Sequence, residues 1–200
     1  MANFDRLAEQ GKPIFLRHNQ EAILRRLGLH VLDGKIPLRY CGEDYAVDCV
    51  SGDVTGPGGL PAGPAETLTI FDMLCHTELP LVLSGEWRTT NTLPGCGQSS
   101  PDDVVLNSPR IRRFEANLPA LRQACEALGG KPFPVGDVAC VLPVFDWFPA
   151  VFQFWCGDDE FPSSARFLWD RSALRYLHYE TLYYIMGHVL SRLDSLLQKS

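Results

Sequence analysis

Two apolar segments in the second half of the chain constrain its fold more than any other feature. Residues 138–144 and 150–156 are almost wholly apolar or aromatic, and only residues 145–149 separate them. Short runs of β-branched and aromatic residues are typical of strands buried on both faces of a sheet. We therefore expect two adjacent strands at the centre of a sheet.

Most of the remaining chain is predicted to form helices and short strands. Residues 35–40 and 45–50 flank a polar turn at 41–44 and predict a hairpin. Apolar residues recur at helical spacing in 13–29, 65–77, 111–128 and 172–199. Gly28 is expected to end the first of these helices, and Pro119 offers a break that would divide the third into two.

Glycine, proline and polar residues predict loops at 52–64, 88–101 and 157–170, and the first of these is not long enough to separate two domains. Helices at the start, middle and end, with strands between them, are typical of the α+β class. With 46% hydrophobic and 21% charged residues, the composition is that of an ordinary globular chain. We predict a single α+β domain over 1–200: a small mixed or antiparallel sheet packed by several helices, with a long C-terminal helix.

Charge and cysteine content limit the partners and the compartment. A net charge of −6 argues against nucleic-acid binding, because an acidic chain repels the phosphate backbone. The apolar runs are shorter than the roughly 18 residues that span a bilayer, and the first residues lack a signal-peptide core, so we expect a soluble cytoplasmic protein. None of the seven cysteines forms a C-x-x-C pair, which favours reduced, buried thiols over a metal cluster, although distant cysteines can still converge.

The densest polar cluster is the acidic loop, Asp158, Asp159 and Glu160, which follows the apolar segment ending near Trp155. Loops that leave buried strands often carry binding sites. At most two of these carboxylates converge on an extended chain, so Asp158 and Glu160 are the candidates for a hard cation or for acid–base catalysis. A solvated turn, or a helix N-cap with an acidic first turn, explains the same residues.

Five further residues outside the acidic loop are ligand-binding candidates. Asp137 precedes a buried strand and Asp170 follows residues 167–169; a functional role would place both near the acidic loop, whereas helix capping alone explains Asp170. Trp87 lies between Glu86 and Arg88, a combination that suits stacking on a planar ligand or holding an anion. The alternative is an amphipathic anchor for the following loop.

The five histidines are scattered, and no two are spaced to predict a metal site. Glu180, Tyr184 and His188 follow one another at intervals of four in the predicted terminal helix, so they share one face. That face either lines a pocket or packs beneath a loop.

Several short motifs together resemble a known family. They are FDML at 71–74, LSGEW at 83–87, LPG at 93–95, LGG at 128–130, GD at 136–137, CGDDEFP at 156–162 and FLWD at 167–170. In this order they resemble the uncharacterised domain of unknown function 3786, over about residues 35–195. The most specific motif is W-x-G-D-x-E-F-P, which aligns with Trp155, Gly157, Asp158, Glu160, Phe161 and Pro162.

The resemblance implies an anaerobic setting, because such proteins occur mainly in anaerobic bacteria and archaea. Some carry an iron–sulfur domain and some accompany corrinoid and one-carbon enzymes, which implies a link to metal, corrinoid or tetrapyrrole cofactors but no established activity. This chain has no added cluster-binding motif, no aromatic residue directly after Trp87, and Cys96 where a glycine is usual. These departures weaken an electron-transfer role.

Three functions follow as hypotheses. The first is a cofactor- or small-molecule-binding accessory protein of anaerobic metabolism with a metalloenzyme partner, its pocket built from the tryptophans and nearby acids. The second is an enzyme that uses Asp158 and Glu160, with Asp137, in acid–base or metal-assisted catalysis. The third is an interaction subunit without a small ligand. The sequence identifies neither the ligand nor the oligomeric state.

Overall fold

The computed structural model describes residues 2–77, 79–96 and 109–198. These ranges contain six α-helices and an antiparallel sheet of eight strands. In chain order the elements are α1 (Ala2–Arg17), α2 (Gln20–Leu27), β1 (Lys35–Tyr40), β2 (Glu43–Asp48), β3 (Val54–Thr55), α3 (Pro64–Cys75), β4 (Trp87–Arg88), α5 (Pro109–Ala116), α6 (Leu118–Ala127), β5 (Lys131–Pro132), β6 (Val138–Phe145), β7 (Phe148–Trp155), β8 (Ser164–Asp170) and α7 (Tyr179–Leu197). The predicted α+β class, antiparallel sheet and long C-terminal helix are confirmed.

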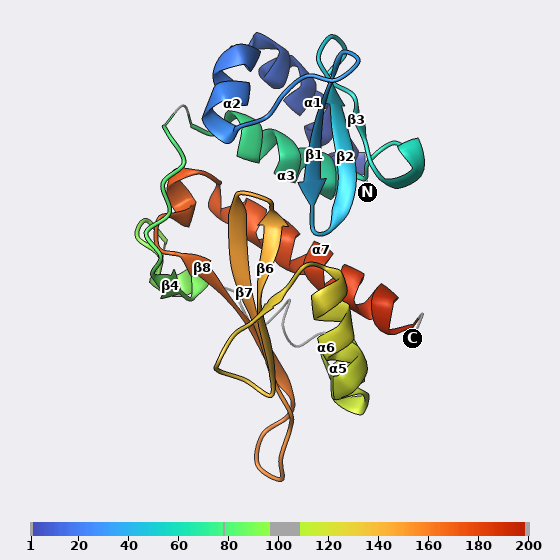
Figure 1. The fold of residues 1–200 in the computed structure, drawn as a ribbon, viewed down its shortest axis with the longest axis vertical. Coiled ribbons are helices and arrows are strands. Elements are labelled where there is room, and N and C mark those ends of the chain that lie inside the picture. The colour runs from blue at the N-terminus through green and yellow to red at the C-terminus, as the bar shows by residue number, and fades with distance from the viewer. Residues whose placement is uncertain (1, 78, 97–108, 199–200) are drawn as a thin grey trace.

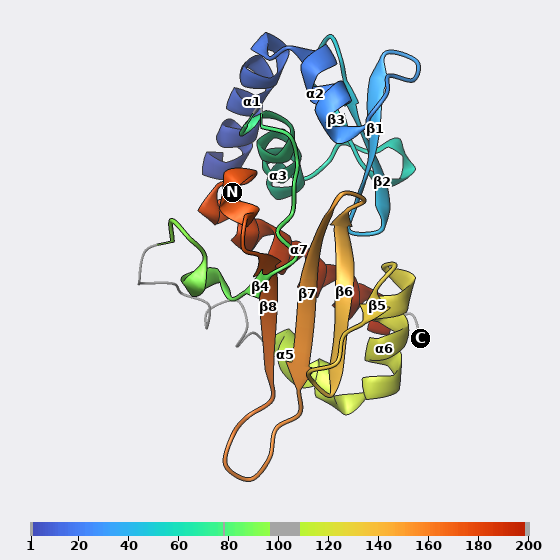
Figure 2. The ribbon, with the colours of Figure 1, turned by 60° about the vertical axis from the view of Figure 1, so that its left-hand side comes forward.

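The sheet has the strand order β3-β2-β1-β6-β7-β8-β4, and β5 pairs with the side of β6. A single residue pair, Tyr40 with Phe145, joins β1 to β6, and their rings stack 5.0 Å apart. Helices α1, α2 and α3 accompany β1–β3 in one half of the molecule, and α5 and α6 accompany β6–β8 in the other (Figures 1 and 2). Helix α7 contacts α3 as well as α5 and α6, so it connects the two halves.

The two central apolar segments form β6 and β7, paired over their full lengths. Burial on both faces is confirmed for β7, where six of eight residues are buried, but β6 alternates between buried and half-buried positions. The hairpin of β1 and β2 is also confirmed, with a tighter turn than expected. Its two turn residues, Cys41 and Gly42, both have positive φ (47° and 78°), which suits the right-handed twist of the flanking strands.

Several predicted boundaries were wrong. The helix expected over 13–29 is divided, because the side chain of Asn19 accepts a hydrogen bond from the Ala22 N–H and starts α2. Gly28 ends α2 as predicted, in the left-handed conformation. The loop expected over 157–170 includes β8, whose buried Ala165 and Phe167 alternate with exposed neighbours. The last of the predicted helices begins at Tyr179, after a short 3-10 turn.

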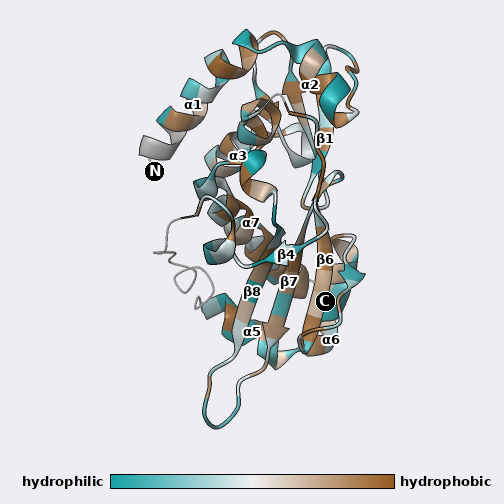
Figure 3. Ribbon diagram, turned by 90° about the vertical axis from the view of Figure 1, so that its left-hand side faces the viewer, coloured by the Kyte–Doolittle hydropathy of each residue, from teal (hydrophilic) through white to brown (hydrophobic). Residues whose placement is uncertain are grey.

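Large aromatic side chains dominate the core. Trp169, Tyr40, Tyr176 and Phe152 are all under 2% exposed. The loop that joins β7 to β8 projects beyond the sheet and is largely hydrophilic (Figure 3). Within the described part of the chain, no helix combines the length and apolarity needed to cross a membrane.

Candidate functional site

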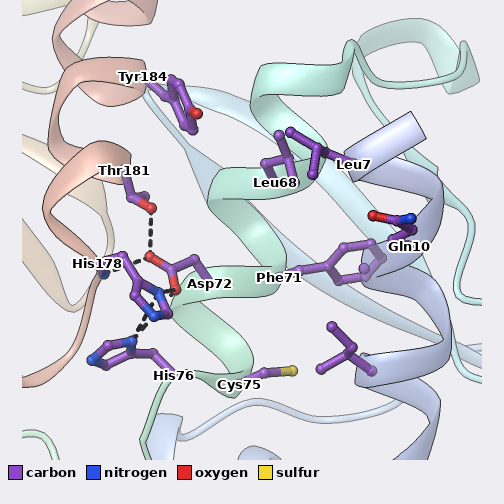
Figure 4. Close-up of a pocket in the computed structure, with 12 residues that line it drawn as sticks. Leu7, Gln10, Leu68, Phe71, Asp72, Cys75, His76, His178, Thr181 and Tyr184 are labelled. Carbon is purple, nitrogen blue, oxygen red and sulfur yellow. Dashed lines mark hydrogen bonds and ion pairs between the residues drawn. The ribbon is translucent and has the colours of Figure 1, made fainter. Parts of the chain in front are cut away.

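Helices α1 and α3 and the start of α7 enclose a groove of about 370 Å³ (Figure 4). Its walls are mostly apolar, and the residues that form them include Leu7, Ile14, Leu68 and Phe71. One end carries polar side chains, among them Asp72, His76, His178 and Thr181. An apolar groove with a few convergent polar groups is the usual form of a small-molecule site.

The polar end is assembled from two helix termini. Asp72 and His76 lie four residues apart in the last turns of α3 and therefore share one face. The backbone of His178 is extended and immediately precedes α7. Asp72 Oδ2 accepts hydrogen bonds from the His178 N–H at 2.8 Å and from Thr181 Oγ1 at 2.5 Å. Asp72 therefore satisfies N–H and hydroxyl donors at the start of α7 and positions the His178 ring beside α3.

Three side-chain atoms converge at this point. Asp72 Oδ1 lies 2.5 Å from His178 Nδ1 and 3.6 Å from His76 Nδ1. The two Nδ1 atoms are 3.0 Å apart, and the rings meet edge to face at an angle of 86°. The side chain of Asp72 is only 10% exposed, whereas those of His76 and His178 are 20% and 65% exposed. Asp72 is therefore the buried member of the cluster, and His178 is the member that faces solvent.

Neighbouring residues fix the C-terminal end of α3, and burial there shifts the pKa values of His76 and Cys75. Arg26 donates hydrogen bonds to the carbonyls of Met73 and Leu74, which are among the last carbonyls of α3, and to the carbonyl of Thr77 just beyond the helix. Burial lowers the pKa of His76 despite the nearby Asp72 carboxylate, so it favours the neutral imidazole. Burial also raises the pKa of Cys75, in the same groove, to about 12.

The acidic loop has a different local structure. Asp158 Oδ1 accepts hydrogen bonds from the N–H groups of Phe161 (2.7 Å) and Glu160 (2.9 Å), which lower its pKa. This carboxylate closes a turn and has the opposite pKa shift from the one expected for a general acid. Asp159 and Glu160 are exposed. A hollow of about 760 Å³ with mixed polar and apolar walls adjoins the loop and is lined in part by Asp158 and Asp159.

Asp137 lies beside the start of the acidic loop, as predicted, and its Oδ2 accepts a hydrogen bond from the Cys156 N–H at 2.7 Å. Trp155 is half-buried at the end of β7, with the Arg166 guanidinium 5.3 Å from its ring centre. The expectation that Asp170 also lies near the loop was wrong. Strand β8 begins beside Trp155 and runs away from the loop, so Asp170 lies at its opposite end.

Asp170 instead joins the sheet to the segment before β4. Its two oxygens accept hydrogen bonds from the N–H and hydroxyl of Ser84, from the N–H of Gly85, and from the N–H and hydroxyl of Ser172. Trp87 pairs with Asp170 across the strands. Glu86 forms exposed ion pairs with Arg88 at 3.2 Å and Arg171 at 3.6 Å.

The residues predicted from sequence therefore form two groups, one at each end of β8. Asp137, Trp155 and the acidic loop make the first group, and Glu86, Trp87, Arg88 and Asp170 make the second. Trp169, expected to line a ligand pocket, is fully buried, and its Nε1–H donates to Thr90 Oγ1. A binding role for either group stays a prediction.

The predicted face of the terminal helix is also divided. Tyr184 lines the groove. His188 instead lies 3.1 Å from Glu66 through its Nδ1 atom and stacks on Tyr40, so it packs against the hairpin rather than against the groove.

Sequence reasoning missed the groove and its polar end. The spacing Asp72-x-x-x-His76 was the local signal, because it places two metal-ligand types on one helix face. His178 is 102 residues further along the chain and follows from no local pattern. Only the packing of α3 against the start of α7 brings the three side chains together.

Fold and groove together define an α+β protein with an open, mostly apolar groove. Comparison with family models then identifies the chain more closely: the model of the domain of unknown function DUF3786 matches residues 19–192, and the chain belongs to this family. The matched range includes α2 and the acidic loop. Neither the curated proteins nor the solved structures contain a match to the chain.

Proposed function

We propose that this protein binds a small molecule or organic cofactor in the groove between α1, α3 and α7, and acts as an accessory protein. The observation that carries the proposal is the joining of apolar walls to three converging polar groups, Asp72, His76 and His178, at one end. This arrangement suits a compound with an apolar body and one polar head.

The dimensions of the groove narrow the class of ligand. Its volume of about 370 Å³ is near the lower end of the roughly 300–1,000 Å³ of small-molecule sites. Leu7 and Ile14 on α1 are 39% and 53% exposed, so this wall has apolar surface available for a ligand to cover. A compact ligand therefore fits better than a large macrocycle.

We also propose a cytoplasmic setting in anaerobic metabolism. Within the described residues no disulfide joins any of the seven cysteines, which supports a reducing compartment. The anaerobic setting and a metalloenzyme partner rest on the family resemblance. Catalysis through Asp158 and Glu160 is the weaker alternative, because the pKa of Asp158 is lowered rather than raised.

Native mass spectrometry of protein purified without oxygen tests the proposal, with the denatured mass as reference. We expect a native mass above that of the bare chain by the mass of an organic compound, and we expect Leu68→Trp to remove this organic excess because the larger ring fills the groove. Leu60→Trp is the matched control, because Leu60 is 68% exposed and does not line the groove. A native mass without an organic excess, or an organic excess that persists in Leu68→Trp, contradicts the proposal.

A further inference from the structure

We propose that Asp72, His76 and His178 bind a divalent first-row transition-metal ion through Asp72 Oδ1 and the two histidine Nδ1 atoms. This inference rests on the proposed function and deepens it, because it makes a metal ion the polar end of the groove. The three atoms belong to one cluster in which all ligand atoms lie within 4.8 Å of one another.

The spacing of the three atoms fits a shared ion. Ligand atoms bound about 2.0–2.1 Å from a tetrahedral metal lie roughly 3.3 Å from each other. The contacts here are 2.5, 3.0 and 3.6 Å, so they bracket that value. The 2.5 and 3.0 Å contacts both involve the His178 ring, whose side chain is 65% exposed, so a small rotation of this ring can lengthen them. The 3.6 Å contact between Asp72 and His76 is already close to the tetrahedral value.

Hydrogen bonding alone leaves this cluster incomplete. His178 Nδ1 faces both Asp72 Oδ1 and His76 Nδ1, and one N–H cannot point along both directions. If both imidazoles carried a proton on Nδ1, two N–H groups would face each other at 3.0 Å. If only His178 carries a proton on Nδ1 and donates it to Asp72 Oδ1, the Nδ1 lone pair of His76 receives no hydrogen bond within the cluster. A metal ion accepts the lone pairs of all three atoms at once.

The type of ligand indicates the class of metal. Two imidazoles and one carboxylate are the ligands of open zinc sites and of non-haem iron(II) sites, in which the remaining positions bind water or substrate. Hard cations such as Mg²⁺ and Ca²⁺ prefer sets made of oxygen. The fixed orientation of Asp72 is also typical, because Thr181 and the His178 N–H hold the carboxylate oxygen that does not face the histidines.

The remaining coordination positions determine what the groove recognises. Asp72, His76 and His178 line the same groove as Leu68 and Phe71 (Figure 4). A ligand whose apolar body lies against these two side chains can place one metal-binding group, such as a carboxylate or a thiolate, at the ion. The structure therefore favours an apolar compound with one metal-ligating end over a purely apolar one.

Titration of the metal-free full-length chain with Zn²⁺, followed by calorimetry, tests the inference. We expect one tight site, and a dissociation constant raised at least 10-fold in both His76→Gln and His178→Gln, since each variant removes a ligand. His30→Gln is the matched control, because His30 is an exposed histidine outside the cluster. Asp72→Asn should behave like the histidine variants, and circular dichroism confirms which variants are folded.

Co²⁺ distinguishes this site from binding by cysteine. Bound through nitrogen and oxygen, Co²⁺ should give visible bands without the near-ultraviolet charge-transfer band of a cobalt–thiolate bond. Unchanged zinc affinity in both histidine variants, or a cobalt–thiolate band in the wild-type chain, overturns the inference.

The two proposals fail in distinguishable ways. Leu68→Trp should lose the organic adduct and keep Zn²⁺ binding, because Leu68 is not among the proposed metal ligands. Absence of the zinc site while the organic adduct persists overturns the metal inference alone. A zinc site in a protein that carries no adduct contradicts the proposed function alone.

Discussion

Replacing Asp170 by asparagine tests whether this residue, a candidate for ligand binding, is structural. Asp170 is 2% exposed and accepts five hydrogen bonds. Four of them reach Oδ1 from Ser84 and Ser172, and Oδ2 accepts the fifth from the Gly85 N–H at 2.7 Å. Asparagine keeps the shape but offers one acceptor oxygen and an NH₂ group.

The expected magnitude follows from these contacts. If the asparagine oxygen stays with the two serines, its NH₂ group faces the Gly85 N–H, which then has no acceptor. An unsatisfied buried donor costs about 1–3 kcal/mol. Loss of the negative charge weakens the remaining bonds by about 1–2 kcal/mol in total. We therefore expect Asp170→Asn to lower the free energy of unfolding by about 3 kcal/mol, which corresponds to about 6–12 °C in Tm for a chain of this size.

The effect should depend on pH. Burial alone would raise the pKa of Asp170, but hydrogen bonds from Ser172, Ser84 and Gly85 outweigh it and hold the pKa below its ordinary value of 3.8. A lowered pKa means that the carboxylate stabilises the fold above pH 3.8, and that this stability is lost as the pH falls through the folded-state pKa. The difference between wild type and Asp170→Asn should therefore be constant from pH 8 to about 5 and narrow below about 4.

Urea unfolding at several pH values measures this difference. Asp159→Asn is the matched control, because Asp159 is exposed and the same change there should leave the unfolding midpoint unaltered. The groove should still bind Zn²⁺ in Asp170→Asn, since Asp170 is not part of it. A loss below about 1 kcal/mol, or a difference that does not change between pH 7 and 3, refutes the structural role.

Three further predictions concern other contacts. Thr181→Val removes the hydroxyl that holds Asp72, and should weaken Zn²⁺ binding by about 10–100-fold; an unchanged affinity in calorimetry counts against this positioning role. Thr90→Val leaves the buried Trp169 N–H without its acceptor, and should reduce stability to urea by about 1–3 kcal/mol; an equal loss in a Trp169→Phe background would show that this hydrogen bond is not the cause. Because the pKa of Cys75 is raised to about 12, iodoacetamide at pH 8 should modify this thiol far more slowly in the native chain than in urea; equal rates by peptide mass mapping contradict the assigned burial.

Local patterns predicted the architecture where burial follows a simple period. Local sequence patterns identified three features correctly: the pair β6 and β7, the hairpin of β1 and β2, and the end of α2 at Gly28. The strand β8 was missed although its buried residues alternate, because its serine, arginine and terminal aspartate resemble a loop. The start of α1 was missed, because the predicted helix began at Pro13, which lies inside a helix that begins at Ala2.

The candidate residues show where local reasoning about sites ends. The acidic loop was visible as a run of charges, but its Asp158 carboxylate is engaged by two backbone N–H groups, a detail that depends on how the turn closes. Helix capping was one explanation of Asp170, but the terminal helix begins at Tyr179 and its N-cap is His178. The Asp170 carboxylate instead accepts hydrogen bonds from Ser84, Gly85 and Ser172. Ser84 and Gly85 precede Asp170 by 86 and 85 residues, so no local capping pattern predicts them as its partners.

The sequence by itself determined the α+β class, the two central strands and the family of this protein, because strand and helix periodicity and short motifs are local properties of the chain. The spacing of Asp72 and His76, which places both on one face of a helix, was present in the sequence but was not singled out. Only the tertiary structure decided that His178 completes the cluster and that an apolar groove adjoins it. The physical reason is that convergence depends on which helices pack together, and that packing is set by the burial of the whole core rather than by any single segment.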